Sequence, residues 1–326
     1  MAEVDDDAER VVAVVTDEVD GVTHRSVAVI PDGDEIVRLR VEGLRPDRPH
    51  RVEIEVDGVL EQQRGSGSFA TAPDGPASFR FVAGACARTG SNGAVFDAML
   101  EEDPLFYLML GDIHYRNLDD DDEDLYRSAY RQVLQQPAQA ELYRNVPISY
   151  VWDDHDYGPN DSDAGAGGRR AARSVFREMV PHHPLELDGD AAIHRAYTIG
   201  RVRFVLTDTR SERTDESMLG VDQLEWLIDE LTHASATHGL VVWANSVPWV
   251  GETSSDAWAR WPEERRRIAD ALAVAGVDNL VMISGDAHMV AIDDGTNTDY
   301  STDQVGGFPL LHAAALDRPG SEKGGP

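Results

Sequence analysis

The sequence has a single cysteine, a single lysine and no long apolar run. One cysteine, Cys86, excludes internal disulfides and any zinc module built from several cysteines. The lysine, Lys323, lies near the end of the chain, which excludes a phosphate-binding P-loop. The patterns His-Glu-x-x-His and Gly-x-Ser-x-Gly are also absent, so neither a zinc protease of that class nor an α/β-hydrolase is indicated.

Signals for membrane insertion and export are missing as well. No apolar stretch approaches the roughly 18 residues of a membrane span. Residues 1–20 lack the basic, apolar and small-residue segments of a signal peptide. A cytoplasmic protein is therefore expected, and the alternative is an exported protein whose signal is not part of this sequence.

The charge balance is strongly acidic. The 326 residues include 60 Asp and Glu against 29 Lys and Arg, a net charge of −31. Such a chain repels phosphate polymers, so no nucleic-acid partner is expected. Acidity with Arg in place of Lys favours adaptation to a salty environment, because high ionic strength screens self-repulsion. The alternative is a codon bias with an incidental acidic surface.

Two domains are expected from the length and from a change in pattern near residue 76. Residues 1–75 contain short, β-rich segments separated by Asp-Gly and Pro-Asp turns, which predicts a small and possibly incomplete β-sandwich. Its expected strands are Val11–Val15, His24–Ile30, Glu35–Val41, Arg51–Val56 and Ser66–Thr71.

Residues 76–326 alternate apolar strands with helical segments, which predicts a layered α/β domain. The strands are almost continuously apolar, as in sheets covered on both faces. The expected strands are Phe79–Ala85, Phe106–Leu110, Pro147–Trp152, Val202–Thr207, Leu240–Ala244 and Leu280–Ile283. The expected helices are a Ser91-capped helix to Glu102, Asp124–Asn145 with a break near Pro137, Arg169–Val180, Asp222–Thr232 and Pro262–Ala275.

Polar residues follow each of these strands. In α/β sheets, sites form beyond the carboxyl ends of the strands, so these groups are expected to converge. A single Asp or His at a strand end is usually a cap or a hydrogen-bonded residue, but a full set of metal-ligating residue types indicates a site. The set is Cys86, Asp112, His114, Tyr115, the run Asp153–Asp156, Asp208, Arg210, Asn245, Asp286 and His288.

Five segments resemble the PhoD-like alkaline phosphatases, which belong to the calcineurin-like metallophosphoesterases. They are Gly84-Ala-Cys86, Gly111-Asp-Ile-His-Tyr115, Val151-Trp-Asp-Asp-His-Asp-Tyr157, Thr207-Asp-Thr-Arg210 and Ser284-Gly-Asp-Ala-His288. The resemblance implies a four-layer α/β/β/α sandwich with a two-metal centre, preceded by a small immunoglobulin-like domain. The chain lacks the C-terminal strands usual in relatives, so a fragment or a shortened member is expected.

The resemblance also implies residue roles. Asp112 would bridge two metals, and His155 would face the substrate as acid or transition-state donor. The ligands of the first metal would be Cys86, Tyr115 and His288, and those of the second Asp154, Asp286 and Asn245.

The expected donor sets differ in their metal preference. Thiolate, phenolate and imidazole suit iron as Fe3+, whereas oxygen donors favour Ca2+, Mn2+ or Mg2+. An acidic protein also needs local positive charge to hold a phosphate. Arg88, Arg116 and Arg210 lie beside the motifs, and Arg210 is favoured because it follows a buried strand. Each could equally form a structural salt bridge.

The resulting hypothesis is an enzyme that hydrolyses small phosphate monoesters or diesters with a metal-activated hydroxide. A loop at Asn160-Asp-Ser-Asp163 would lie over the site and could bring an Asn or Asp near the metals. Two alternatives are a catalytically silent relative that binds metal or phosphate, and an acidic interaction protein that binds no metal.

Overall fold

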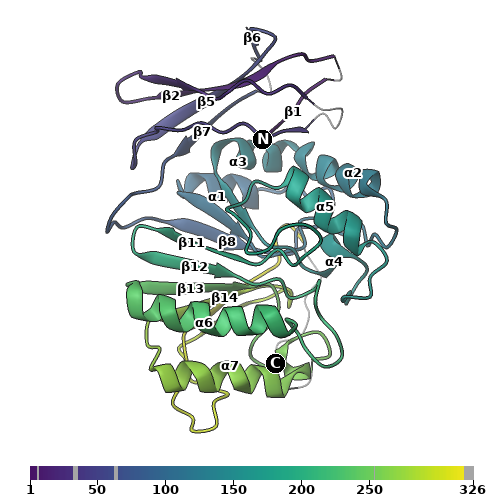
Figure 1. Ribbon diagram of the computed structural model, residues 1–326, viewed down its shortest axis with the longest axis vertical. Helices are drawn as coiled ribbons and strands as arrows, with labels where there is room; N and C mark the ends of the chain where they lie inside the picture. Colours follow the sequence, from purple (N-terminus) through teal and green to yellow (C-terminus); the bar gives the residue numbers. More distant parts are fainter. Residues whose placement is uncertain (6, 32–35, 62–64, 253, 319–326) are drawn as a thin grey trace.

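The computed structural model describes residues 1–5, 7–31, 36–61, 65–252 and 254–318. Its first part is β-rich and lies at one end of the molecule, above the helices in Figure 1. The strand order is β3-β2-β5-β6, with β7 also paired to β5. The strands are β2 (Val11–Asp17), β3 (Thr23–Arg25), β5 (Pro49–Val56), β6 (Val59–Leu60) and β7 (Ser66–Ala70), with a separate pair of β1 (Ala2–Glu3) and β4 (Ile36–Val37).

Two expected strands of this part are shorter than predicted. The strand predicted over His24–Ile30 ends at Arg25, and the one predicted over Glu35–Val41 is reduced to Ile36–Val37. Val27 and Ile30 are 84% and 76% exposed, so no buried face holds a longer β3 in register. Glu35 lies outside the described residues.

The second part contains two sheets that differ in size. The smaller is parallel, with the order β10-β9-β8, and the larger is mixed, with the order β11-β12-β13-β14-β16-β15. The smaller sheet consists of β8 (Phe81–Gly84), β9 (Phe106–Met109) and β10 (Ile148–Tyr150). The larger consists of β11 (Arg195–Ile199), β12 (Val202–Leu206), β13 (Leu240–Asn245), β14 (Leu280–Ser284), β15 (Val290–Asp293) and β16 (Leu310–Ala313).

All six predicted strands are present here, and three were not anticipated. β11 forms an antiparallel hairpin with β12, and β15 and β16 extend the sheet beyond β14. These segments are short and partly polar, so their alternation alone does not distinguish them from loops. The mixed α/β class agrees with the prediction.

Helices cover the outer faces of these sheets. The helices are α1 (Val95–Glu101), α2 (Glu123–Leu134), α3 (Pro137–Asn145), α4 (Asp154–Tyr157), α5 (Arg169–Met179), α6 (Val221–Thr237), the 3-10 turn Trp258–Arg260 and α7 (Pro262–Ala275). The predicted break at Pro137 is confirmed, because Pro137 begins α3. Ser91 does not cap α1, since Ala94 occupies the cap position and makes no side-chain bond.

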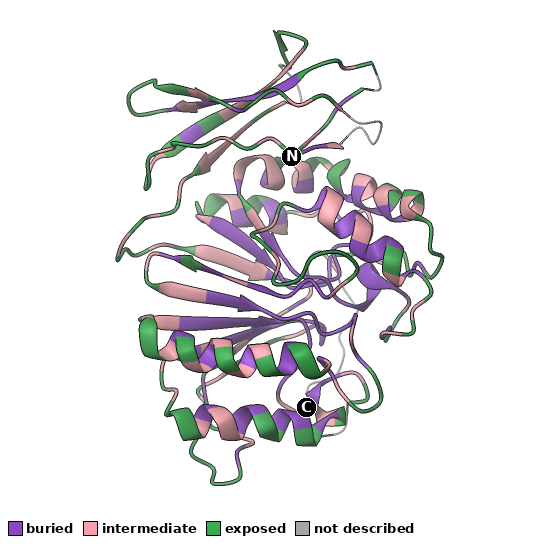
Figure 2. Ribbon diagram, in the orientation of Figure 1, coloured by how far each residue is buried: buried purple, intermediate pink, exposed green. Residues whose placement is uncertain are grey.

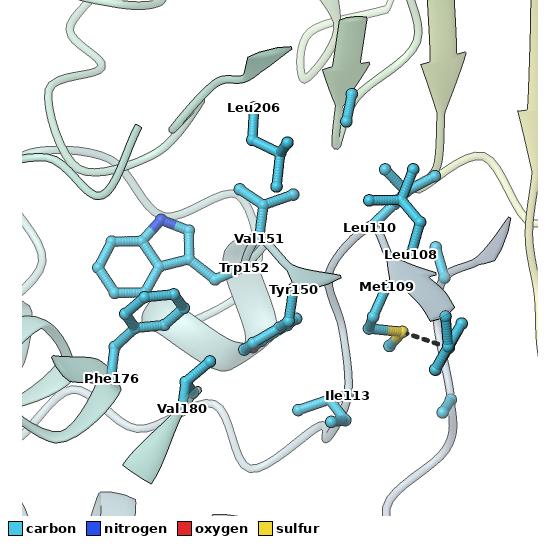
Figure 3. Packing of buried hydrophobic residues seen from close by; sticks show 14 of the residues in the cluster. Leu108, Met109, Leu110, Ile113, Tyr150, Val151, Trp152, Phe176, Val180 and Leu206 are labelled. Carbon is cyan, nitrogen blue, oxygen red and sulfur yellow. Dashed lines mark hydrogen bonds between the residues drawn. The ribbon is translucent and has the colours of Figure 1, made fainter. Parts of the chain in front are cut away.

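Alternate residues of the larger sheet belong to two different apolar clusters. Phe204 and Leu206 of β12 pack with residues of the smaller sheet and α5, whereas Val205 packs with α6 and α7. Figure 3 shows Leu206 beside Val151, with Trp152 against Phe176. Figure 2 shows these strands buried along much of their length. Among the described helices, none is long and apolar enough to cross a membrane.

The carboxyl ends of the two sheets meet. Gly285 follows β14, and a Cβ atom there would lie 2.7 Å from the Ala85 side chain. The same atom would lie 3.1 Å from the carbonyl oxygen of Ser246 and 3.2 Å from that of Leu110. Only glycine permits this approach, and it brings the loops after β8, β9, β13 and β14 into one place.

Candidate metal centre and active site

Four of the converging residues have left-handed backbone conformations. The φ angles of Cys86, Asp112, Asp286 and His288 are 62°, 58°, 73° and 52°. Each such position costs on the order of 1–3 kcal/mol for a side chain other than glycine, and such positions cluster at functional sites. The conformation turns the chain sharply as it leaves each strand and directs these residues to a common point.

The first group of potential ligands combines sulfur, oxygen and nitrogen. Donor atoms of Cys86, Asp112 and His288 all lie within 4.8 Å of one another, and all three residues are buried. The Tyr115 hydroxyl donates to Asp112 Oδ2 at 2.6 Å and lies 3.2 Å from His288 Nε2. The structure therefore brings together the four residues expected at the first metal.

Asp112 also belongs to a second group. Its carboxylate, a carboxylate oxygen of Asp154 and a ring nitrogen of His155 lie within 4.8 Å of one another. A third group consists of Asp154, Asp161 and Asp256. Asp161 donates its backbone N–H to Asp154 Oδ2 at 2.7 Å. One carboxylate thus joins two donor groups, as a bridging ligand requires.

The electrostatics of the site favour bound cations. Burial, together with the charges of Asp154, Asp153 and Asp156, raises the pKa of Asp112 well above its usual value. Burial and the charges of Asp112 and Asp286 likewise raise the pKa of the Cys86 thiol. Crowded buried carboxylates repel one another, and a cation among them removes that repulsion. The donor chemistry and the charge therefore both fit a metal centre.

Asp156 organises the loops that carry the ligands. Its carboxylate accepts hydrogen bonds from the backbone N–H groups of Asp112 at 2.5 Å, His114 at 3.2 Å and Asp153 at 3.2 Å. Burial raises the pKa of Asp156 to about 7. These bonds tie the loop after β9 to the start of α4, so both ligand-bearing segments share one anchor.

His155 lies beside the two groups. Its Nδ1 is hydrogen bonded to Asn117 Oδ1, and its ring centroid lies 4.0 Å from that of Tyr115. Its Nε2 lies 3.9 Å from Asp154 Oδ1. An amide oxygen can only accept, so the Asn117 bond places a proton on Nδ1 and leaves Nε2 as the atom directed to the centre.

Arg210 lies in the interior and contacts carboxylates of the protein itself. Its guanidinium is fully buried, donates from Nε to Asp153 Oδ1 at 2.6 Å, and forms a bidentate pair with Asp256 at 2.7 and 2.9 Å. These bonds engage all three guanidinium nitrogens. The side chain is therefore built to orient two carboxylates beside the donor groups, which was the salt-bridge alternative considered from the sequence.

The other predicted residues occupy several settings. Arg88 and Arg116 are exposed beside the site, and Arg116 donates to Gln132 Oε1 at 3.0 Å. The Asn245 amide is turned to Val247 and to Trp258, whose Nε1 donates to Asn245 Oδ1 at 3.2 Å. The Asp286 carbonyl oxygen lies 3.8 Å from Cys86 Sγ. The roles predicted for Arg88, Arg116, Asn245 and Asp286 stay predictions.

Several residues at the site escaped the sequence analysis. Asp161 lies in the loop that was expected over the site, but Asp256 lies in a segment without any motif. Asn117 is close to a recognised motif and Asp156 lies within one, yet only their contacts show what they do. Arg318 donates to His288 Nε2 from the far end of the described chain, and no local pattern indicates this.

Comparisons with known proteins agree with this geometry. The fold resembles the solved structure of PhoD, with a TM-score of 0.74 and 18% identity, covering 97% of this chain and 71% of that chain. It also resembles the purple acid phosphatase PPD1 from yellow lupin (Lupinus luteus), with a TM-score of 0.59 and 13% identity, covering 96% and 61%.

A curated relative and a family match identify the group. Alkaline phosphatase D of Bacillus subtilis (strain 168) is 23% identical over 203 residues, which is 50% of this chain. The match spans about a third, 34%, of that relative's length. Residues 81–308 match the family described as PhoD-like phosphatase, and this range includes every predicted ligand. The chain belongs to the PhoD-like phosphatase family.

Proposed function

We propose that this protein is a metal-dependent phosphoric ester hydrolase that acts on small phosphate monoesters or diesters. The observation that carries the proposal is the position of Asp112, which belongs to both a Cys86/His288 group and an Asp154/His155 group. Family membership and the likeness to alkaline phosphatase D support the same reaction class. Bound metals would supply Lewis acidity and lower the pKa of a water molecule.

The two donor groups suit different metals. Cys86, Tyr115 and His288 offer thiolate, phenolate and imidazole, which favour iron as Fe3+. Asp154 offers a carboxylate, and the resemblance adds Asp286 and Asn245; such oxygen donors favour Ca2+, Mn2+ or Mg2+. Asp112 would serve both sites.

The protein's own groups have distinct roles in this proposal. In its imidazolium form, His155 would give the Nε2 proton to the leaving oxygen, while Asn117 fixes the ring through the Nδ1 proton. Arg210 holds Asp153 and Asp256 in place and acts as a positioning residue. Arg88 and Arg116, which are exposed, remain available to approach the substrate from outside.

The finer architecture belongs to the same proposal. We assign residues 1–75 to an immunoglobulin-like domain and residues 76–326 to the catalytic domain. The arrangement of α1–α5, the two sheets, and α6 with α7 is consistent with a four-layer α/β/β/α sandwich. β7 packs on α3, where Ser68 donates to Asn145 Oδ1 at 2.9 Å, so the first domain contacts the second directly.

The test is hydrolysis of p-nitrophenyl phosphate and bis-p-nitrophenyl phosphate in molar KCl, with the metal content measured on the same sample. Turnover that a chelator abolishes, with two metals per chain, is expected. Asp112→Asn should lose metal and lower kcat at least about a thousandfold, because both groups share this ligand. Asp294→Asn, at an exposed acid outside the site, is the matched control.

Other outcomes have definite meanings. Near-normal turnover in Asp112→Asn would show that the site is wrongly assigned. Two bound metals without turnover of either ester would indicate a silent metal-binding relative. A folded protein with neither metal nor turnover would contradict the whole proposal.

A further inference from the structure

The chain crosses between the two sheets after its last strand. Two of the expected ligands come from different sheets, since Cys86 follows β8 and His288 follows β14. Beyond β16, the backbone N–H of Ala314 donates at 3.2 Å to the carbonyl oxygen of the residue after His288. The backbone N–H of Leu316 then donates at 3.0 Å to the carbonyl oxygen of Ala85, directly before Cys86. The segment after β16 therefore joins both ligand-bearing loops.

The bond from Leu316 acts on the backbone of Cys86 itself. The φ angle of Cys86 is 62°, a conformation that side chains other than glycine rarely adopt. One peptide group links Ala85 to Cys86. Its carbonyl oxygen accepts from Leu316, and its N–H donates to the carbonyl oxygen of Gly111 at 3.0 Å. The two groups of a trans peptide point in opposite directions, so these bonds fix its plane from both sides. A strained conformation persists where the surroundings over-determine it in this way.

The surroundings of Leu316 keep its N–H in place. The side chain is 7% exposed and packs against Gly84, where a Cβ atom would lie 2.9 Å from it. The next residue, Asp317, accepts through Oδ2 from the Asn92 backbone N–H at 3.0 Å. Asn92 lies near the other end of the loop that begins at Cys86. Two successive residues therefore hold this loop at both of its ends.

We propose that Leu316 is a positioning residue that holds Cys86 in the conformation of a metal ligand; this rests on the proposed function. Without the Leu316 N–H, the peptide group before Cys86 loses one of the two bonds that fix its plane. Cys86 could then relax to a negative φ, which would turn its Sγ away from Asp112 and His288. Tyr115 would be affected less, because its N–H is held separately by Thr89 Oγ1 at 2.6 Å.

The experiment uses Cys86 as its reporter, because it is the single thiol of the chain. Its rate of alkylation is measured in the metal-free protein. Its thiolate-to-metal absorption band is measured in protein loaded with Co2+, with Cys86→Ser as the baseline. Leu316→Ala removes the anchoring side chain, and Leu316→Pro removes the N–H. The control is Leu224→Ala on α6, because Leu224 is 6% exposed and belongs to the other apolar cluster.

The expected results separate position from stability. Leu316→Ala and Leu224→Ala should lower the urea midpoint to a similar extent, because each removes a buried leucine side chain. Alkylation in the Leu316 variants should be about five- to tenfold faster than in Leu224→Ala, the effect of one lost hydrogen bond on a local opening. The cobalt–thiolate band should weaken in the Leu316 variants and persist in the control.

Two results would overturn the inference. One is an equal rate of alkylation in Leu316→Ala and Leu224→Ala, which would leave Leu316 a role in general packing alone. The other is an unchanged cobalt–thiolate band in both Leu316 variants. If Leu316→Pro does not fold, Leu316→Ala with its matched control still decides the question. A wild-type protein without the cobalt–thiolate band would count against the proposed metal site alone, since alkylation of the metal-free protein still tests Leu316.

Discussion

Replacement of Arg210 by Met tests whether this buried guanidinium holds the site together. Its three nitrogens bond to Asp153 at 2.6 Å and to Asp256 at 2.7 and 2.9 Å, and the side chain is fully buried. Methionine keeps the volume of the aliphatic stem but removes the charge. Both carboxylates then remain buried without their main counter-charge, and among the described residues Arg213 is the cation that still pairs with Asp256.

The expected loss is large. Breaking a buried ion pair by removing one partner costs about 3–5 kcal/mol, because the remaining charge is uncompensated. Arg170→Met is the matched control: its pair with Asp121 is 61% and 40% exposed, and such pairs contribute about 0–1 kcal/mol. Asp256→Asn in the Arg210→Met background should recover part of the stability, since one orphaned charge is removed.

The pH dependence provides a second readout. Burial raises the pKa of Asp256, but Arg210 and Arg213 outweigh it and hold that pKa below its usual 3.8. A carboxyl group whose pKa is lower in the folded than in the unfolded protein stabilises the fold at pH values above its unfolded-state pKa. This stability is lost as the pH falls through the folded-state pKa. Without Arg210 the pKa of Asp256 should rise. The difference between variant and wild type should therefore shrink as the pH falls from neutral, because the orphaned carboxylates become protonated.

The assay is urea unfolding of both variants with a chelator present and KCl held constant. A loss in Arg210→Met no larger than in Arg170→Met would refute the buried-network reasoning. If Arg210→Met were instead as stable as wild type but bound inorganic phosphate more weakly, the original expectation of a substrate contact would hold.

Three other measurements test separate features. Burial lowers the pKa of His194 from 6.5 to about 4, so the free energy of unfolding of the wild type should fall by up to about 3 kcal/mol as the pH drops through that interval. The His194→Gln variant should lose less stability over the same interval, as urea unfolding can measure. Gly111→Ala should lower the free energy of unfolding by several kcal/mol in the same assay, since φ is 97° and the new Cβ would lie 2.4 Å from that of Asp153. The control is Gly21→Ala, whose backbone also has a positive φ but whose Cβ would lie in open space, so it should lose about 1 kcal/mol. Raising KCl from about 0.1 to 1 M should raise the urea midpoint by screening the net charge of −31, and a fall would contradict salt adaptation.

Local signals account for what could be predicted from the sequence. α7 runs from Pro262 to Ala275 as predicted, because proline fits the first helical turn and Gly276 adopts φ 66° after its end. The apolar strands were recognisable because their residues are buried or half-buried on both faces. Their polar ends converge because parallel strands direct their carboxyl ends to one edge.

Contacts between distant segments account for what could not be predicted. Asp256 joins the site from a loop whose composition is ordinary. β15 adds to the sheet although none of its residues is buried, and β16 alternates buried with half-buried residues. Ser91 suits a helix cap by type, yet the chain between it and α1 takes another course. In each case the deciding partner lies far away in the sequence.

Arg210 shows how burial decides between roles that residue type leaves equal. Arg210 follows a buried strand, and for that reason it was expected to meet the substrate. The same position places its guanidinium in the interior, where desolvation requires carboxylate partners, and Asp153 and Asp256 then use its donors. A charge that must bind a phosphate and release the product needs a partner-accessible position at the edge of the site. The arginine beside the motif thus orients two carboxylates at the candidate site, and its burial, which the sequence does not reveal, decides this role.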